Sequence, residues 1–130
     1  MENSELIAAA RRVVSPRDLP HDVELGYVGC ALVTPKGNVY TGCSAHATCG
    51  VGFCAEVCAV AAMIAGGEQE IEMLVAVSVE GSILTPCGRC REMILQLNSR
   101  GYDALIVVSA ASAVPLGDLL PRHWLRDDGA

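Results

Sequence analysis

Basic residues are scarce in this sequence. Among 130 residues it has 9 Lys and Arg against 15 Asp and Glu, which gives a formal net charge of −6. A nucleic-acid-binding domain of this size is usually basic, so the charge balance predicts that the protein has no nucleic-acid partner. An acidic surface is compatible with a neutral or cationic small ligand.

Long apolar runs are missing as well. No stretch has the length that a bilayer-spanning helix needs, so we expect no membrane partner. The N-terminus carries Glu2 and Glu5 around a short apolar patch, without the basic start and apolar core of a signal peptide, which predicts a cytoplasmic location. Internal repeats and linker-like segments are also lacking. Because 52% of the residues are hydrophobic, we expect residues 1–130 to form a single domain around a substantial core.

Turn residues divide the chain into alternating apolar segments. Ser4 is a candidate N-cap for the first helix, and Ser44 to Gly52 has no clear period and is expected to be a loop. The segment at 54–65 is apolar nearly all round, which is typical of a buried helix. The expected helices are 4–14, 54–65, 87–98 and a short one at 116–120, and the expected strands are 25–33, 39–43, 71–80 and 104–109. The alternation in the second half predicts an α/β fold with a mixed sheet and helices on its faces.

Seven cysteines are many for a chain without signs of secretion, and they indicate metal binding or catalysis rather than disulfides. Two of the predicted helices begin at cysteine motifs, Cys54-Ala55-Glu56 and Pro86-Cys87-Gly88-Arg89-Cys90. Helix N-termini favour the thiolate form that binds metal. Cys54, Cys87 and Cys90 are therefore candidate zinc ligands. Three ligands leave one tetrahedral position for a water, whose pKa zinc lowers towards about 7.

Glu56 follows two residues after Cys54, where it can move protons without binding the metal. This combination of a first ligand, one residue, Glu and a later P-C-x-x-C is the pattern of zinc deaminases. Two alternatives remain. Cys58 could complete a four-cysteine structural site, although this would leave Glu56 unexplained, and a redox C-x-x-C would leave Cys54 unused. The remaining cysteines are interpreted as small apolar residues.

These motifs resemble the cytidine deaminase family, in particular its small homotetrameric branch. The resemblance extends from about Tyr27 to Trp124. Besides the two cysteine motifs, it rests on three further matches: Val28-Gly29-Cys30-Ala31-Leu32, Thr41-Gly42-Cys43 and Leu119-Leu120-Pro121. It implies a three-layer α/β/α sandwich with a mixed central sheet, one Zn²⁺ per subunit and hydrolytic deamination. It also implies a homotetramer, or dimer of dimers, whose neighbouring subunits help to close each active site.

The resemblance also implies roles for residues around the ring. The backbone N–H of Ala55 and the C=O of Thr85 would orient the substrate ring. Trp124 is either a C-terminal packing residue or an aromatic lid over the substrate of a neighbouring subunit, and its family position favours the lid. The family's Asn-x-Glu, which holds the ribose hydroxyls, is replaced here by Ser44-Ala45-His46, so Ser44 and His46 are candidate substrate contacts.

The Arg that often follows C-A-E in the family, where it offsets the thiolate charge, is Val57 in this chain. We expect Arg89 to take over that role. Together with the missing ribose clamp, this departure makes the chain similar to blasticidin S deaminase-like members. The predicted function is zinc-dependent deamination of cytidine or of a modified cytosine nucleoside such as blasticidin S. The alternatives are deamination of a purine or pterin, or a non-catalytic structural zinc module.

Overall fold

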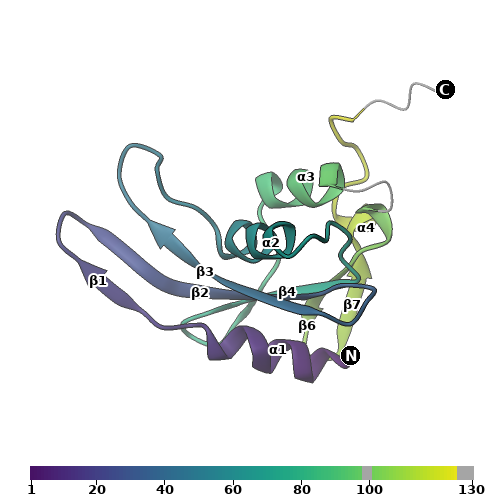
Figure 1. Ribbon diagram of the computed structural model, residues 1–130, viewed down its shortest axis with the longest axis horizontal. Helices are drawn as coiled ribbons and strands as arrows, with labels where there is room; N and C mark the ends of the chain where they lie inside the picture. The colour runs from purple at the N-terminus through teal and green to yellow at the C-terminus, as the bar shows by residue number, and fades with distance from the viewer. Residues whose placement is uncertain (98–100, 126–130) are drawn as a thin grey trace.

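The computed structural model describes residues 1–97 and 101–125 of the chain, and in these residues one mixed β-sheet carries helices on both faces (Figure 1). The helices are α1 (Asn3–Arg12), α2 (Ala55–Ala65), α3 (Gly88–Leu97), the 3₁₀ helix η1 (Gly101–Asp103) and α4 (Leu116–Leu119). The strands are β1 (Arg17–Leu19), β2 (Val23–Val33), β3 (Val39–His46), β4 (Met73–Ser78), β5 (Ile83–Leu84), β6 (Leu105–Ser109) and β7 (Ser112–Pro115).

The sheet is mixed because a single crossover joins two parallel strands. Its order is β1-β2-β4-β6-β7, with β3 paired to β2 and β5 paired to β4. β4 and β6 run parallel, and α3 lies between them in the chain, whereas the other pairs are antiparallel. The β1–β2 hairpin and the connection from β3 to α2 form an arm that extends away from the body of the molecule (Figure 1).

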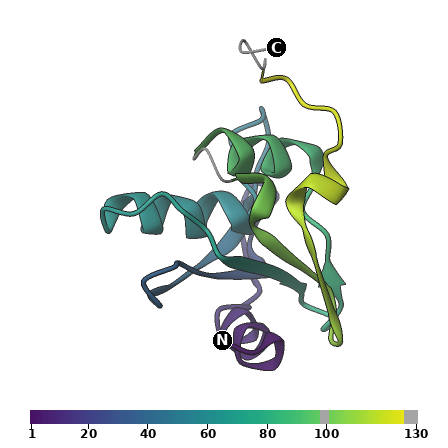
Figure 2. The same ribbon diagram turned by 90° about the vertical axis from the view of Figure 1, so that its right-hand side faces the viewer.

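The helices form two outer layers. α1 covers one face of the sheet, and α2, α3 and α4 lie on the other (Figure 2). Side chains of successive strand residues point to opposite faces, so Cys30 and Leu32 join the core beneath α2, whereas Ala31 and Val33 join the core beneath α1. Strands buried on both faces are expected to be apolar, as the buried parts of β2, from Gly29 to Val33, and of β4, from Leu74 to Val77, are. The predicted three-layer α/β/α sandwich is confirmed.

Several local predictions need correction. The N-cap of α1 is Glu2, not Ser4, because the helix begins one residue earlier and the Glu2 N–H donates to Glu5 Oε2 at 3.3 Å. Residues 44–46 belong to β3 rather than to a loop, since His46 pairs with Glu24 of β2. α2 is half exposed in the single chain, with Ile64 at 50% exposure. Three short strands, β1, β5 and β7, lie outside the predicted ones, and residue 98 of the predicted third helix lies outside the described residues.

Within the described part of the chain, no helix combines the length and the apolar character that crossing a membrane requires.

Candidate active site

Two helix starts face each other at the centre of the site. Cys54 is the N-cap of α2, and Cys87 immediately precedes α3. The segment before Cys54 is held to the end of β3, because the backbones of Ala45 and Phe53 exchange two hydrogen bonds of 3.0 and 2.8 Å. The sheet therefore fixes the point at which α2 begins.

The three cysteines that the sequence singles out lie together. Cys54 Sγ is 3.9 Å from Cys87 Sγ, Cys87 Sγ is 3.5 Å from Cys90 Sγ, and all three sulfurs lie within 4.8 Å of one another. Three sulfurs at the usual Zn–S length of about 2.3 Å in tetrahedral directions are roughly 3.8 Å apart. The donor set and its spacing thus fit zinc. Cys58 does not belong to this group of metal-competent side chains in the described residues.

The three thiols differ in acidity. Burial raises the pKa of Cys90 and also that of Cys54. Burial acts in the same direction on Cys87, but hydrogen bonding with the backbone N–H and thiol of Cys90, with the Cys54 thiol and with the backbone N–H of Arg89 outweighs it and lowers the pKa of Cys87. Cys87 is therefore the most acidic thiol of the group, and a bound cation would be needed to hold all three as thiolates.

Glu56 is the buried carboxyl group beside the cysteines. Its side chain is 6% exposed, and this burial raises the pKa of its carboxyl group, while hydrogen bonds from its own backbone N–H and from Cys90 act in the opposite direction. A carboxyl group whose pKa is raised towards neutral pH is suited to both accepting and donating a proton. Its position in the first turn of α2 follows directly from the spacing in Cys54-Ala55-Glu56.

A pocket of about 170 Å³ opens in front of Glu56. Its lining contains every substrate-side residue predicted from the sequence except Trp124: Ser44, His46, Ala55 and Thr85, together with Val28, Cys54, Glu56, Ala76, Leu84 and Cys87. The N–H of Ala55 belongs to the first residue of α2, where no intrahelical partner exists. The pocket therefore combines metal-competent sulfurs, a proton carrier and a free backbone donor.

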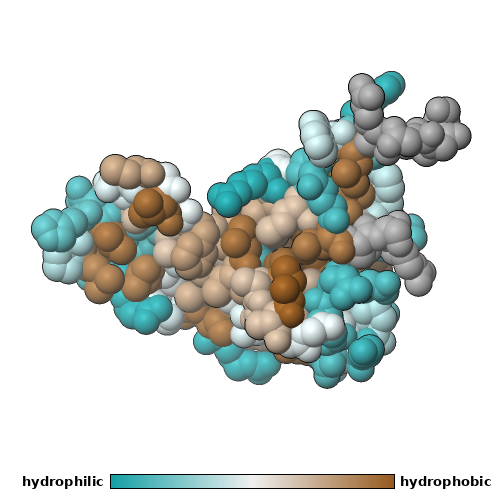
Figure 3. Space-filling view, turned by 45° about the horizontal axis from the view of Figure 1, so that its top comes forward, coloured by the Kyte–Doolittle hydropathy of each residue, from teal (hydrophilic) through white to brown (hydrophobic). Residues whose placement is uncertain are grey.

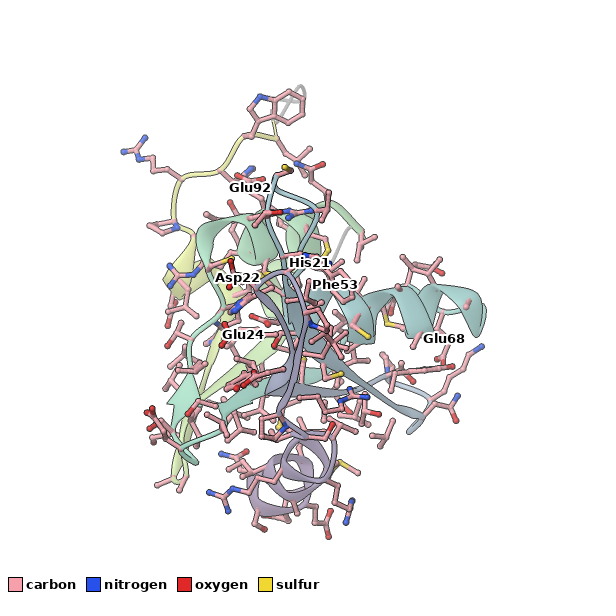
Figure 4. All side chains as sticks on the ribbon, turned by 90° about the vertical axis from the view of Figure 1, so that its left-hand side faces the viewer. His21, Asp22, Glu24, Phe53, Glu68 and Glu92 are labelled. Carbon is pink, nitrogen blue, oxygen red and sulfur yellow. The ribbon has the colours of Figure 1, made fainter. Side chains whose placement is uncertain are left out.

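The two residues at the place of the ribose clamp already have protein partners. Ser44 is buried, and its hydroxyl accepts the N–H of Val28 at 3.0 Å. His46 Nδ1 lies 3.9 Å from Glu24 Oε1, and both side chains are exposed, at 62% and 49% (Figure 4 labels Glu24). Sequence reasoning missed Glu24, because its approach to His46 depends on the register between β2 and β3.

The comparisons with known proteins agree with this geometry. Residues 4–106 match the family model described as the cytidine and deoxycytidylate deaminase zinc-binding region. The chain belongs to this family. A cytidine deaminase of Mycobacterium tuberculosis (strain ATCC 25618 / H37Rv) is 36% identical over 102 residues, which cover 78% of this chain and 74% of the relative. A blasticidin-S deaminase of Bacillus cereus is 34% identical over 110 residues, which cover 78% of this chain and 79% of the relative.

Solved structures of the family have the same fold. The crystal structure of cytidine deaminase from Mycobacterium tuberculosis has a TM-score of 0.82 at 30% identity and covers 97% of this chain and 99% of that one. The cytidine deaminase from Burkholderia pseudomallei has a TM-score of 0.77 at 28% identity, and the match covers 95% of this chain and 100% of that one. The predicted family and enzyme class are confirmed: the chain is a zinc-dependent deaminase of cytidine-like nucleosides.

Three predicted site residues lie outside the pocket lining of this enzyme: the buried Cys90, and Trp124 and Arg89. The Trp124 side chain is 77% exposed, and its backbone N–H donates to Glu92 Oε1 at 2.8 Å. The Arg89 side chain is also exposed, and the contact that Arg89 makes with Cys87 comes from its backbone N–H. Sequence reasoning missed the bonding role of Arg91, which follows Cys90 directly and donates to two backbone carbonyls.

Proposed function

We propose that Cys54, Cys87 and Cys90 bind one zinc ion per subunit, and that Glu56 carries the protons in the hydrolytic deamination of a cytosine nucleoside. The observation that carries this proposal is the buried carboxyl group of Glu56 in a pocket lined by Cys54 and Cys87, whose sulfurs cluster with that of the buried Cys90. The sulfur spacing suits zinc, and the carboxyl group is placed to act on a water and on the substrate. A structural four-cysteine site gains no support from the position of Cys58.

The chain's own residues account for the remaining steps. Zinc, when bound, acts as a Lewis acid that lowers the pKa of water towards about 7. Glu56 accepts a proton from the attacking water, donates it to the ring nitrogen beside the reacting carbon, and then delivers a proton to the leaving amine. Ammonia departs, and the ring carbon retains the oxygen as a carbonyl. The Ala55 N–H and the Thr85 C=O orient the ring amide and the amine.

The substrate side of the pocket favours a nucleoside whose sugar is held differently from that of cytidine. Ser44 and His46 stand where the family has Asn-x-Glu, and we propose both as substrate contacts. The Ser44 hydroxyl can still donate while it accepts from Val28. The resemblance to blasticidin-S deaminase supports a modified cytosine nucleoside, and the resemblance to cytidine deaminase supports cytidine itself.

A substrate screen tests the proposal. Zinc-loaded protein is assayed for ammonia release from cytidine, deoxycytidine, cytosine, blasticidin S, guanine and adenosine, with Cys90→Ser as the control for contaminating deaminases. We expect release from cytosine nucleosides or blasticidin S and none from the purines. Release from guanine or adenosine alone would show that the substrate class is wrong, and no release from any compound would contradict an active enzyme.

We also propose that the protein is a homotetramer, or dimer of dimers, with shared active sites. A pocket of about 170 Å³ is smaller than the 300–1,000 Å³ usual for a ligand site, so walls from another subunit would help to enclose a nucleoside. Apolar side chains also remain exposed on the surface (Figure 3), among them Val51, Phe53, Ile64, Trp124 and Leu125. Trp124 is the proposed lid over a neighbour's substrate. Light scattering that gives a monomeric mass would contradict this assembly.

Four further proposals follow from the sequence. Residues 1–130 form one deaminase domain, the protein is cytoplasmic and it binds no nucleic acid, in keeping with a net charge of −6. Arg89 offsets the thiolate charge that the Val57 position leaves uncompensated, and the hydrogen bond from its backbone N–H to Cys87, which places this residue next to the thiol, supports the role. If Arg89→Ala binds zinc as tightly as the wild-type protein, Arg89 has no such role.

A further inference from the structure

Arg91 connects the second cysteine motif to the C-terminal part of the chain. It lies on α3 one residue after Cys90, and its side chain is half-buried. Its Nε donates to the backbone carbonyl of Pro86 at 2.8 Å, and its Nη1 donates to the carbonyl of Leu119, also at 2.8 Å. One guanidinium group therefore joins two segments, at Pro86 and at Leu119, that lie 33 residues apart in the chain.

Arg91 also holds the cysteine motif through its backbone. Its N–H donates to the carbonyl of Cys87 at 3.0 Å. Two consecutive carbonyls, those of Pro86 and Cys87, are thus fixed by a single residue. Because Cys87 lies immediately outside α3, these bonds determine the course of the backbone that carries its sulfur.

The other end of the connection is firmly anchored. Leu119 is the last residue of α4, so its carbonyl lacks an intrahelical donor and the guanidinium group supplies one. At the start of α4, Leu116 is fully buried and its N–H donates to the Ala104 carbonyl at 2.8 Å. The Leu119 carbonyl is therefore held in place by α4, whose residue Leu116 belongs to the core between the sheet and helices α2 and α3.

The neighbouring residue holds a different part of the same segment. Glu92 Oε1 accepts the backbone N–H of Trp124 at 2.8 Å, and Figure 4 shows Glu92 beside the C-terminal segment. In the described residues, the Glu92 side chain forms hydrogen bonds with Gln96 and Trp124 and none with the cysteine motif. Arg91 and Glu92 are thus a natural pair for comparison, since both hold the C-terminal segment but only Arg91 holds the cysteine motif.

We propose that Arg91 is a positioning residue for metal binding, which braces the Pro86–Cys87 backbone against α4 and so keeps Cys87 at ligand distance from Cys54 and Cys90. The proposal rests on the proposed zinc site. A lysine at this position would keep the charge but could not donate in two fixed directions to two carbonyls, because only the guanidinium group is a rigid fork. The structure therefore requires arginine here and not merely a positive charge.

The test compares the zinc affinity of Arg91→Lys with that of the wild-type protein by competition with a chromophoric chelator. Residues that orient metal ligands typically contribute 10–100-fold to metal affinity, and we expect the zinc Kd of Arg91→Lys to rise by about that factor. The thermal unfolding midpoint of the zinc-free protein should stay close to that of the wild type. Two matched variants, Glu92→Ala and Arg11→Lys on the opposite face of the sheet, should keep the wild-type Kd.

The outcomes separate this proposal from the proposed function. Cys90→Ser is measured first, and unchanged zinc binding by that variant would overturn the metal site itself. If Cys90→Ser loses zinc but Arg91→Lys matches the wild-type Kd, only the role of Arg91 is overturned. It is overturned as well if Arg91→Lys lowers the zinc-free unfolding midpoint and the Kd returns to the wild-type value at a temperature where the variant is folded. If Arg91→Lys does not fold, Arg91→Gln is measured against the same criteria.

Discussion

Gly42 of β3 lies directly against Ala59 of α2. A Cβ built on Gly42 would stand 2.3 Å from the backbone nitrogen of Ala59 and 2.6 Å from the Cβ of Cys58. A glycine is needed here because the helix backbone itself occupies the space of a side chain. This close approach brings α2 into contact with the sheet about one turn after Glu56. It therefore determines how far Cys54 and Glu56 lie from β3.

We expect Gly42→Ala to destabilise the protein by roughly 2–3 kcal/mol, because overpacking forces a rigid helix away from the sheet. Gly67→Ala is the matched control, since Gly67 has open space around it and only its φ of 87° opposes a side chain, at a cost of about 1 kcal/mol. Denaturant unfolding of both variants measures the difference. If Gly42→Ala costs no more than Gly67→Ala, the close approach is not a constraint.

The two cysteine motifs could be predicted because their geometry is local. Cys87 and Cys90 are three residues apart, which is close to one helical turn, so helix geometry alone brings them together. Cys54 and Glu56 are two residues apart at the start of α2, so the local sequence places both at the same end of that helix. Apolar runs likewise predicted the main strands, since strands buried on both faces have no polar alternation to obscure them.

What the sequence did not reveal depends on contacts between distant segments. The extension of β3 to His46, and with it the pairing to Glu24, is set by register across a hairpin with an irregularity between Leu25 and Gly29. The bond from Arg91 to the Leu119 carbonyl needs the folded position of α4. The exposure of one side of α2 was not expected either, because an apolar helix looks the same in sequence whether its own chain or another subunit covers it.

Cys58 distinguishes a three-cysteine site from a four-cysteine site. It lies on α2 four residues after Cys54, and its Cβ packs beside Gly42 rather than joining the sulfur cluster. We expect Cys58→Ser to keep the zinc content of the wild-type protein and Cys90→Ser to lose it, as measured by elemental analysis after dialysis. Loss of zinc from Cys58→Ser in a folded protein would instead favour a structural site.

Glu56→Gln should separate zinc binding from turnover. The glutamine amide has the same size as the Glu56 carboxyl group, and burial at this position already disfavours the charged carboxylate. The variant should therefore keep its fold and its zinc content. It cannot accept the proton of the attacking water, and turnover should fall by roughly 10²–10⁴-fold. Ammonia release per bound zinc is the quantity to measure. Wild-type turnover in this variant would rule out Glu56 as the proton carrier.

Glu68 links the β2–β3 hairpin to the end of α2. Its Oε2 accepts hydrogen bonds from Asn38 Nδ2 at 2.8 Å and from the Tyr40 hydroxyl at 2.9 Å. The bond from Asn38, followed by those from Thr34 and Tyr40, lowers the pKa of Glu68. Because the folded pKa lies below the unfolded one, the ionised carboxylate stabilises the fold at neutral pH, and this contribution disappears as the pH falls through the folded pKa.

Glu68→Gln should therefore be less stable than the wild-type protein at pH 7, with a gap that narrows as both proteins are acidified. Chemical denaturation at pH 7 and at acidic pH measures this gap. A gap of equal size at both values would mean that the carboxylate charge is irrelevant and that only the shape of the side chain matters.

The Glu24–His46 pair offers a test of substrate choice. The family holds ribose with a carboxylate at the position of His46, but His46→Glu alone would place two carboxylates opposite each other on paired strands. The double variant Glu24→His/His46→Glu keeps a pair of one carboxylate and one imidazole and moves the carboxylate to the clamp position. A hydrogen bond to a charged group contributes about 1.5–3 kcal/mol, so we expect kcat/KM for cytidine to rise by about tenfold or more. The activity on free cytosine, which has no ribose, should not change. An equal change for cytidine and cytosine would show that this edge of the pocket does not contact the sugar.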